Sequence, residues 1–402
     1  MLSVEEARAR ILAALSPVGT QWVGLAEAWG RVLAEDVTAR HDKPLADVSS
    51  MDGYAVRAAD CVRAPCTLRV VGSAPAGHPF AGHVGPGEAV RVFTGSVIPE
   101  GADSVVIQED TDLGEREVGI LAPAAAGRHI RRRGGDFAHG TILLRAPRRL
   151  GVRDIALAAA ADRPWLRVYR RPRVAILSTG DEVVRPGEPI PPGGVVSSNA
   201  LALAALVQSC GAEPIDLGIA PDDVRAIAGL VREARGADLV VTSGGASVGA
   251  HDLVHDSLAQ EGLDLAFWKV AMRPGKPFLF GTVGGTPLFG LPGNPVSVLV
   301  CGLLFVGPAL HRLAGLPGDP PQPEVARAGC ALPANDLRAD HLRARLTRDD
   351  DGGWLATPFP TQDSSQLRIL ADADALILRP PHAPPVQAGD PLPILRLGVQ
   401  GY

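Results

Sequence analysis

Residues 286–297 read TPLFGLPGNPVS, and they follow FWKVAMRPGKPFLFG at residues 267–281. The run TPLFGL is short and apolar, and it predicts a strand. The turn Pro292-Gly293-Asn294-Pro295 comes next, and Val296 to Val306 is predicted to be a helix. A strand, a glycine-containing turn and a helix N-terminus present backbone N–H groups to an oxyanion, and Ser297 adds a hydroxyl. We therefore expect a phosphate-like ligand at this turn.

Three cations precede the turn within eight residues: Lys269, Arg273 and Lys276. Prolines and a glycine separate them, which predicts an irregular segment rather than a helix face. A cationic loop of this kind is often only a solvated surface. However, the chain has 39 Lys plus Arg and only three lysines, of which the third is Lys43. Because Lys and Arg differ as anion ligands, the retention of two lysines here favours an anion site.

The composition limits the class of protein. A chain of 402 residues, with 46% hydrophobic and 21% charged residues, predicts a globular protein of several domains. The net charge of −5 argues against a general nucleic-acid binder. The N-terminus lacks a signal pattern, and no uninterrupted apolar run has the length of a membrane span. Five cysteines without a CxxC pair do not suggest disulfides, so we expect a cytoplasmic protein.

Strands and helices alternate from Arg173 onward, which predicts an α/β domain with a mainly parallel sheet. The loops STGDE, TSGGASVGAHD and GLPGNPVS each follow a predicted strand. The carboxyl ends of parallel strands share one edge of a sheet, where ligands bind in such folds. Three informative loops on one rim therefore predict a ligand site there.

The flanking regions have different patterns. Ser3 and Glu6 form a capping-box signature for a helix that ends near Leu15, and further helices are expected at Leu25–Leu33 and Val152–Ala161. Short β-prone runs separated by glycines predict a small all-β domain before residue 145, and a β-barrel-like domain ends the chain. The predicted domains are a helical or extended linker domain (1–40 and 140–170), a small β domain (41–139), a three-layer α/β domain (171–316) and a C-terminal β domain (322–402).

Five ordered motifs carry a resemblance to a known family: SSMDGYAV, STGDEVV, TSGGASVGAHD, WKVAMRPGKPFLFG and GLPGNPVSV. They resemble the molybdopterin molybdenumtransferase family, which includes bacterial MoeA and the C-terminal part of gephyrin. The resemblance covers essentially the whole chain and implies a four-domain homodimer with shared active sites. The implied reaction inserts molybdenum from molybdate into adenylylated molybdopterin and releases AMP, with Mg²⁺ present.

The resemblance also implies roles for individual residues. The implied molybdate ligands are Arg273, Lys276, Ser297, Arg343 and Ser365. The implied catalytic residues are Asp52, Thr94, Asp136, Glu182, Asp222, Asp252, Lys269, Arg273 and Lys276, with Glu182 and Asp252 as metal ligands. The implied contacts to molybdopterin and its phosphate are Ser243, Gly244, Gly245, Ser247, Gly293 and Asn294. Carboxylates are what a hard cation beside a pyrophosphate requires, and cationic, hydroxyl and N–H donors suit molybdate.

The chain departs from the family pattern at three places. Ala250-His251 precedes Asp252 where an acidic residue is common, Gly135 replaces an acid before Asp136, and Arg273 stands where lysine is common. Two alternatives stay open at this point: a molybdopterin adenylyltransferase-like or nucleotide-hydrolysing enzyme, and a non-catalytic scaffold of the gephyrin kind. A molybdopterin adenylyltransferase is the expected protein partner, with no nucleic acid and no membrane.

Overall fold

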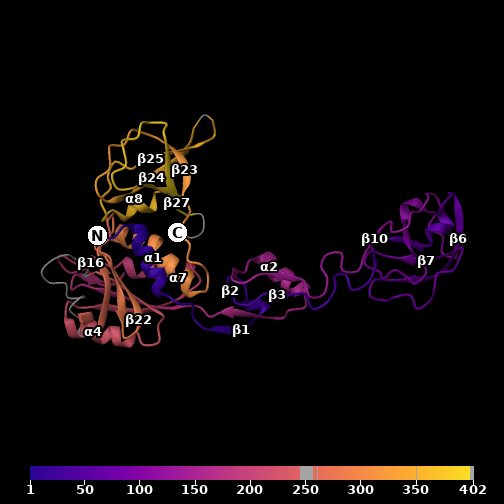
Figure 1. The fold of residues 1–402 in the computed structure, drawn as a ribbon, viewed down its shortest axis with the longest axis horizontal. Helices are drawn as coiled ribbons and strands as arrows, with labels where there is room; N and C mark the ends of the chain where they lie inside the picture. Colours follow the sequence, from indigo (N-terminus) through magenta and orange to yellow (C-terminus); the bar gives the residue numbers. More distant parts are fainter. Residues whose placement is uncertain (245–256, 260, 350, 399–402) are drawn as a thin grey trace. The chain divides into compact units, whose positions relative to one another are not determined.

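The computed structural model describes residues 1–244, 257–259, 261–349 and 351–398. The chain forms two compact units (Figure 1). The first contains Met1–Gln21, Gly30–Ala34 and Arg167–Tyr402, and the second contains Trp22–Trp29 and Glu35–Leu166. The four domain limits expected from the sequence stay a prediction.

A six-stranded sheet forms the centre of the first unit. Its order is β17-β14-β18-β22-β21-β19, and the first four strands are parallel to one another. β21 and β19 complete the sheet in antiparallel fashion. The strands are β14 (Arg173–Thr179), β17 (Glu213–Ala220), β18 (Leu239–Ser243), β19 (Leu263–Trp268), β21 (Leu279–Val283) and β22 (Thr286–Leu291). The mainly parallel α/β sheet expected from the alternating pattern is confirmed.

Helices pack on both faces of this sheet. Successive side chains of a strand point to opposite faces, so β14 contributes residues to a separate core on each face. Val174 and Ile176 of β14 join a core with residues of α1 (Val4–Ala14), α3 (Asn199–Ser209) and the helix that follows β22. Ala175 and Leu177 join a separate core with α4 (Val224–Glu233). The three-layer arrangement is therefore confirmed. A two-stranded ribbon, β15 (Val183–Val184) and β16 (Val195–Val196), lies beyond the end of β14.

The helix after β22 is longer than expected. It continues from α6 (Pro295–Cys301) through a π-helical turn, η4 (Gly302–Val306), into α7 (Gly307–Leu313). Its 19 residues, with a mean hydropathy of 1.8, have the length and composition of a membrane span, contrary to the expectation that no run would. Of the segment that meets this test, 83% is buried inside the protein. Its apolar character is thus explained by core packing, as in the 4.5 Å contact between the ring centroids of Phe278 and Phe305.

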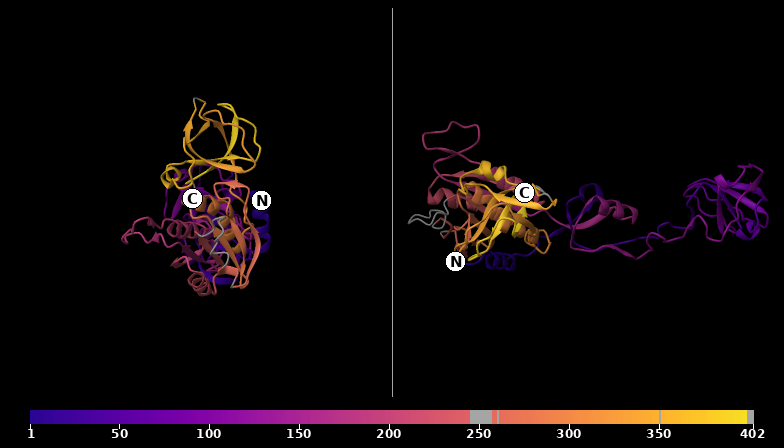
Figure 2. Two further views of the ribbon diagram at one scale, coloured as in Figure 1. Left: turned by 90° about the vertical axis from the view of Figure 1, so that its left-hand side faces the viewer. Right: turned by 90° about the horizontal axis from the view of Figure 1, so that it is seen from above.

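The C-terminal strands form a closed sheet. Its order is β20-β24-β25-β23-β27-β26, and pairing between β24 and β26 closes it (Figure 2, left). The members are β23 (Glu324–Ala328), β24 (Ala339–Arg348), β25 (Trp354–Pro358), β26 (Ala375–Arg379) and β27 (Pro391–Arg396), with the short helix α8 (Leu367–Ala371) between β25 and β26. β20 (Met272–Arg273) comes from the α/β region and pairs in parallel with β24. The expected barrel-like domain is therefore present, with one strand supplied from outside it.

The second unit contains a five-stranded sheet of order β8-β5-β7-β6-β9. These strands are β5 (Gly53–Val56), β6 (Cys66–Ala74), β7 (Glu88–Val92), β8 (Ser104–Ile107) and β9 (Glu117–Ile120). Two short ribbons pair β3 (Val37–Thr38) with β11 (Ile142–Leu144) and β4 (Val48–Ser49) with β10 (Ile130–Arg131). The other elements of the chain's first 170 residues are β1 (Thr20–Gly24), η1 (Leu25–Glu27), β2 (Val32–Leu33), η2 (Ala58–Cys61), η3 (Gln108–Asp110), β12 (Arg148–Arg149), α2 (Val152–Ala160) and β13 (Trp165–Tyr169).

One local prediction is wrong. The helix expected at Leu25–Leu33 is a single 3₁₀ turn, η1, followed by β2. Gly30 has φ +74°, a left-handed conformation that ends any helix and returns the chain to the extended β2. The capping box at Ser3 and the helix after Gly151 are as expected, and all five cysteines are free.

Candidate active site

The four parallel strands of the α/β sheet end at one rim. Thr179 ends β14, and Ser243 ends the neighbouring β18. The Ser243 hydroxyl lies 3.4 Å from the hydroxyl of Ser178. Gly244 has φ +98°, and a Cβ at this position would lie 2.5 Å from the carbonyl oxygen of Thr179. Only glycine therefore fits the turn after β18, which passes directly over the end of β14.

The turn after β22 lies against the same rim. A Cβ added to Gly293 would be 3.8 Å from the Cα of Gly244. The Asn199 side-chain amide, at the start of α3, donates a hydrogen bond of 2.8 Å to the Gly293 carbonyl. Ser297 is buried in the first turn of α6. Two of the glycines predicted to contact molybdopterin thus lie side by side.

A loop of the barrel, residues 359–365, reaches the N-terminus of α6. The Asn294 amide donates to the Ser364 hydroxyl over 2.7 Å, and the Val296 N–H donates to the Ser364 carbonyl over 3.1 Å. Ser365 follows directly, and both its N–H and its hydroxyl donate to Asp363, each over 2.8 Å. These bonds bring Ser365 close in space to Ser297, although the two are far apart in sequence.

Arg343 supports this loop from within the barrel. It is 1% exposed, and its guanidinium donates to the Gln362 side-chain oxygen over 3.1 Å and to the Asp363 carbonyl over 2.7 Å. Burial lowers the pKa of Arg343 from its usual high value, and the charge of Asp363 opposes that shift. At least two of the donors of this predicted molybdate ligand are therefore used to hold the loop that carries Ser365.

Three carboxylates gather where β14 and β17 end. The Asp222 N–H donates to Asp181 over 3.0 Å, and the carboxylate of Glu182 lies beside Gly180, 2.7 Å from where a Cβ would be. Partial burial, together with the negative charges of Asp181 and then Glu182, raises the pKa of Asp222. Within the described part of the chain, no group of three His, Cys, Asp or Glu side chains is arranged to hold a metal ion. The acids concentrate negative charge at the rim without forming a complete ligand set.

The cationic segment is largely irregular, as expected. Lys269 has φ +90°, and its ammonium lies 5.1 Å from the centre of the Trp268 ring. Gly275 has φ +107°, and a Cβ there would lie 2.6 Å from Cys301 Sγ of α6. The half-buried Lys276 accepts 3.1 Å bonds at its carbonyl from the N–H groups of Val270 and Phe278. The segment is therefore packed tightly against the helix that carries Ser297.

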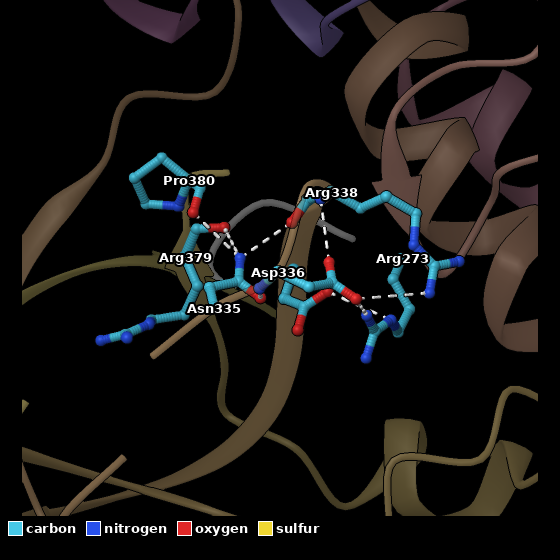
Figure 3. Close-up of polar contacts among 7 residues, drawn as sticks. Arg273, Asn335, Asp336, Arg338, Arg379 and Pro380 are labelled. Atoms are coloured by element: carbon cyan, nitrogen blue, oxygen red, sulfur yellow. Dashed lines mark hydrogen bonds and ion pairs between the residues drawn. The ribbon is translucent and has the colours of Figure 1, made fainter. Parts of the chain in front are cut away.

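Arg273 differs from the two lysines because its guanidinium is bound by carboxylates of the barrel. It hydrogen-bonds to Asp336, and its Nε lies 3.3 Å from Asp340 Oδ1 (Figure 3). Arg338 lies 3.7 Å from the same Asp336 carboxylate. A cavity of about 290 Å³ adjoins this group and is lined by Arg273, Asp336, Asp340 and Arg379, among others.

In the second unit, two predicted catalytic residues contact each other directly. Asp52 accepts bonds from the Thr94 N–H over 2.7 Å and from the Thr94 hydroxyl over 2.9 Å. These bonds lower the pKa of Asp52. Asp136 lies 3.9 Å from the ammonium of Lys43. Arg132 and Arg133, which precede Asp136, form ion pairs with Asp47 and Asp42, respectively. These pairs favour a role for the two arginines in stabilising the fold rather than in binding an anion.

Some predicted residues cannot be placed, and some contacts were not predicted. Gly245, Ser247 and Asp252, with Ala250 and His251, lie outside the described residues. The bridge from Asn199 to Gly293, the contact of Ser364 with Asn294 and the carboxylates around Arg273 were missed. The polar sequence QDSSQ at 362–366 was the one available signal for Ser364, because its position between a strand and a helix indicates a loop.

Comparison with known proteins covers nearly the whole chain. Residues 2–161 match the family model for the MoeA N-terminal region (domain I and II), residues 175–312 match the probable molybdopterin binding domain, and residues 325–397 match the MoeA C-terminal region (domain IV).

Relatives of full length are known. The chain is 39% identical to a molybdopterin molybdenumtransferase of Nostoc sp. over 94% of this chain and 89% of that protein. It is also 39% identical to molybdopterin molybdenumtransferase 2 of Mycobacterium tuberculosis over 98% and 99%, respectively. A solved structure of the molybdopterin biosynthesis MoeA protein of Pyrococcus horikoshii superposes with a TM-score of 0.87 at 32% identity, covering 99% of each chain.

Proposed function

Since this chain belongs to the family of MoeA-type molybdopterin molybdenumtransferases, which insert molybdenum into molybdopterin during cofactor biosynthesis, we propose that its substrates are molybdate and adenylylated molybdopterin. The products would be the molybdenum cofactor and AMP. The adenylylated form supplies a pyrophosphate anion, and molybdate is a second, tetrahedral anion. Both need donors that stabilise negative charge.

One observation carries this proposal: the rim, the N-terminus of α6 and the 359–365 loop converge at the hydrogen bond between Asn294 and Ser364. Around it lie hydroxyl, amide and backbone N–H groups from three separate segments. Such donors suit a tetrahedral oxyanion. We propose that Lys276, Ser297, Arg343 and Ser365 surround molybdate, with Lys269 and Arg273 nearby. Ser243, Gly244, Gly293 and Asn294, with Gly245 and Ser247, would contact molybdopterin and its phosphate.

We propose that Mg²⁺ binds among the acids of the rim. Carboxylate oxygens are the ligands that Mg²⁺ prefers. Partial burial, and then the negative charges of Asp181 and Glu182, raise the pKa of Asp222, and a cation would offset those charges. Glu182 and Asp252 are the proposed ligands, with Asp222 beside them. Bound there, Mg²⁺ would neutralise charge on the pyrophosphate. The residues of the chain itself would orient that group through the N–H donors of the Gly244 and Gly293 turns.

The second unit supplies the remaining proposed catalytic residues, Asp52, Thr94 and Asp136. We propose that the protein is a homodimer in which these residues complete the active site of the other subunit. Asp52→Ala and Asp252→Ala homodimers would then both be inactive. A mixed dimer would contain one site with both lesions and one with neither, so it would regain about half of the wild-type activity. Mixed dimers as inactive as both parents would show that Asp52 does not act across subunits.

The deciding experiment measures AMP release from adenylylated molybdopterin with and without molybdate. The proposal requires release that depends on molybdate and yields metal-containing cofactor. Release of AMP or consumption of ATP without molybdate would instead favour a nucleotide-hydrolysing or adenylyltransferase-like enzyme, and binding without turnover would favour a scaffold. The relatives with full-length matches are named as transferases, which supports the first outcome. We further propose a cytoplasmic location and a molybdopterin adenylyltransferase as the protein that supplies the substrate.

A further inference from the structure

The three cations of the 269–276 segment are in different electrostatic situations. Arg273 is bound by two carboxylates, Asp336 and Asp340. Lys276 has no ion-pair partner in the part of the chain that the structure describes, and its side chain is half-buried. An incoming dianion therefore meets one cation that is paired with carboxylates and one that has no counter-ion among the described residues.

The charge of Arg273 is compensated locally, by its two carboxylates. Arg273 and Arg338 bring two positive charges, and Asp336 and Asp340 bring two negative charges (Figure 3). Arg379 also faces this group, but its guanidinium donates to the carbonyls of Pro333 and Pro384. A dianion placed beside Arg273 would meet a guanidinium whose Nη2 and Nε already face carboxylates, so its charge is less available than that of a cation without a counter-ion.

The carboxylates are fixed rather than mobile, because the loop that carries Asp336 is tied to the barrel. The Asn335 amide donates to three carbonyls, those of Arg338, Arg379 and Pro380, over 2.8, 2.9 and 2.9 Å (Figure 3). Asp336 also accepts the N–H of Arg338 over 2.9 Å. Asp340 stands directly opposite Arg273 in the pairing of β20 with β24. The guanidinium of Arg273 is thus held by two carboxylates, Asp336 and Asp340, whose positions are set by the barrel.

A short covalent path leads from Arg273 to Lys276. Only Pro274 and Gly275 separate them, and Gly275 is wedged against Cys301 of α6. Beyond Lys276, the chain enters β21 through Phe278, which is fully buried. Fixing Arg273 therefore fixes one end of a segment whose other end is already anchored, and Lys276 lies between the two.

We propose that Arg273 is a positioning residue rather than a molybdate ligand, and that Asp336 and Asp340 of the barrel hold it so that Lys276 faces the oxyanion. The inference rests on the proposed function. It assigns the barrel a part in oxyanion binding through a salt-bridge clamp (Arg273, Asp336 and Asp340) that joins β20 to the barrel.

The test exchanges the charges of the clamp in the full-length protein. Arg273→Asp should raise the half-saturating molybdate concentration by about tenfold or more, and Asp336→Asn should raise it by about threefold. The affinity for adenylylated molybdopterin should stay within about twofold of wild type. The double variant Arg273→Asp with Asp336→Arg rebuilds the ion pair in reverse and should return the molybdate dependence to within about threefold of wild type. Arg327→Gln, which removes a barrel cation paired with Asp349 and Asp351, is the matched control and should change neither quantity.

The outcomes separate the possible roles. If the double variant stays as defective as Arg273→Asp, while its thermal unfolding midpoint recovers, Arg273 itself contacts molybdate and the proposal is wrong. If Asp336→Asn lowers the half-saturating concentration, Asp336 competes with molybdate, which also overturns the proposal. If the wild type shows no molybdate-dependent AMP release at all, the proposed function fails instead. The clamp is then judged by the unfolding midpoint alone, which must fall in Arg273→Asp and recover in the double variant.

Discussion

Asp52 in the second unit and Asp222 at the rim are both predicted catalytic carboxylates, yet their surroundings are opposite. Asp52 accepts two hydrogen bonds from Thr94, which lower its pKa. Asp222 is partly desolvated beside Asp181 and Glu182, which raises its pKa. The protein stabilises the first charge with its own groups and destabilises the second.

The difference indicates which region is organised before a ligand arrives. The Asp52–Thr94 pair is complete, so it can present a carboxylate of fixed orientation without any further partner. The rim holds crowded acids, and Lys276 has no ion-pair partner among the described residues, so bound counter-charges would lower the electrostatic free energy of both. The rim is therefore the region where we expect substitutions to alter ligand binding most strongly.

The largest effect is expected for Gly244→Ala, which tests whether the rim depends on close backbone approach. The new Cβ would lie 2.5 Å from the Thr179 carbonyl, in a left-handed backbone conformation. We expect unfolding to become easier by about 3 kcal/mol and molybdopterin binding to be lost. Thermal unfolding and titration with adenylylated molybdopterin measure the two effects.

Gly262→Ala is the matched control for this substitution. Gly262 also has a positive φ, +81°, but a Cβ there meets nothing within 4 Å. It should cost only about 1 kcal/mol and leave ligand binding intact. Equal losses in both variants would mean that backbone strain, and not the approach to Thr179, explains the effect of Gly244→Ala.

Lys276→Ala has the next largest expected effect. It tests whether a cation without an ion-pair partner among the described residues contributes more to anion binding than a paired cation. Removal of a charged donor from a bound anion costs about 2–3 kcal/mol, so Lys276→Ala should raise the half-saturating molybdate concentration about 30- to 150-fold. Arg232, which is paired with Glu261 over 3.8 Å, provides the comparison. Arg232→Ala should change the molybdate dependence by less than about twofold. Steady-state AMP release over a molybdate series gives both values, and equal values would remove Lys276 from the site.

The smallest effects are those of pH, and they have opposite signs for the two acids. The lowered pKa of Asp52 means that its charge stabilises the fold above the ordinary carboxyl pKa, a contribution lost as the pH falls through the folded pKa. The raised pKa of Asp222 means that its charge destabilises the fold at neutral pH, and this penalty disappears on acidification. Asp52→Asn should therefore lower, and Asp222→Asn should raise, the unfolding midpoint at pH 7 by about 1–3 °C.

The difference for Asp222→Asn should close as the pH falls to the ordinary carboxyl pKa of about 4. The difference for Asp52→Asn should persist at that pH and close only below it, so the series of unfolding curves has to run from about pH 7 to about pH 3. If the unfolding midpoints of both variants moved in the same direction, the two carboxylates would not have opposite effects on stability, and the comparison of the two regions would be wrong. Asp222→Asn should also reduce catalysis while stabilising the protein, since groups that bind ligands commonly oppose stability.

Sequence patterns predicted the features that depend on local chemistry. Alternation of strands and helices gave the sheet, and the positions of Ser243, Gly244 and Gly293 after strands placed them on one rim. The motif resemblance paired Asp52 and Thr94 in one site, and their side chains do touch. The helix expected at Leu25–Leu33 failed because Gly30 takes a left-handed conformation that a helix-prone composition does not reveal.

Long-range contacts could not be predicted in this way. Arg273 and Asp336 are 63 residues apart, and Asn294 and Ser364 are 70 apart. Which carboxylate faces which guanidinium depends on how the barrel packs against the α/β region, and no local periodicity encodes that packing. The sequence therefore indicated Lys269, Arg273 and Lys276 as one group but offered no basis for separating Arg273 from Lys276.

The strand that the barrel receives from outside, β20, also protects the barrel from other chains. It covers the backbone of β24 at Ala339 and Asp340, beyond the stretch that β25 covers. A fragment that begins at Glu324 would lack β20, and this part of β24 would present unpaired N–H and C=O groups to solvent. Uncovered strand edges pair readily with strands of other molecules, so such a fragment would be prone to aggregate. By supplying β20, the α/β region thus covers a strand edge of the barrel that would otherwise favour aggregation.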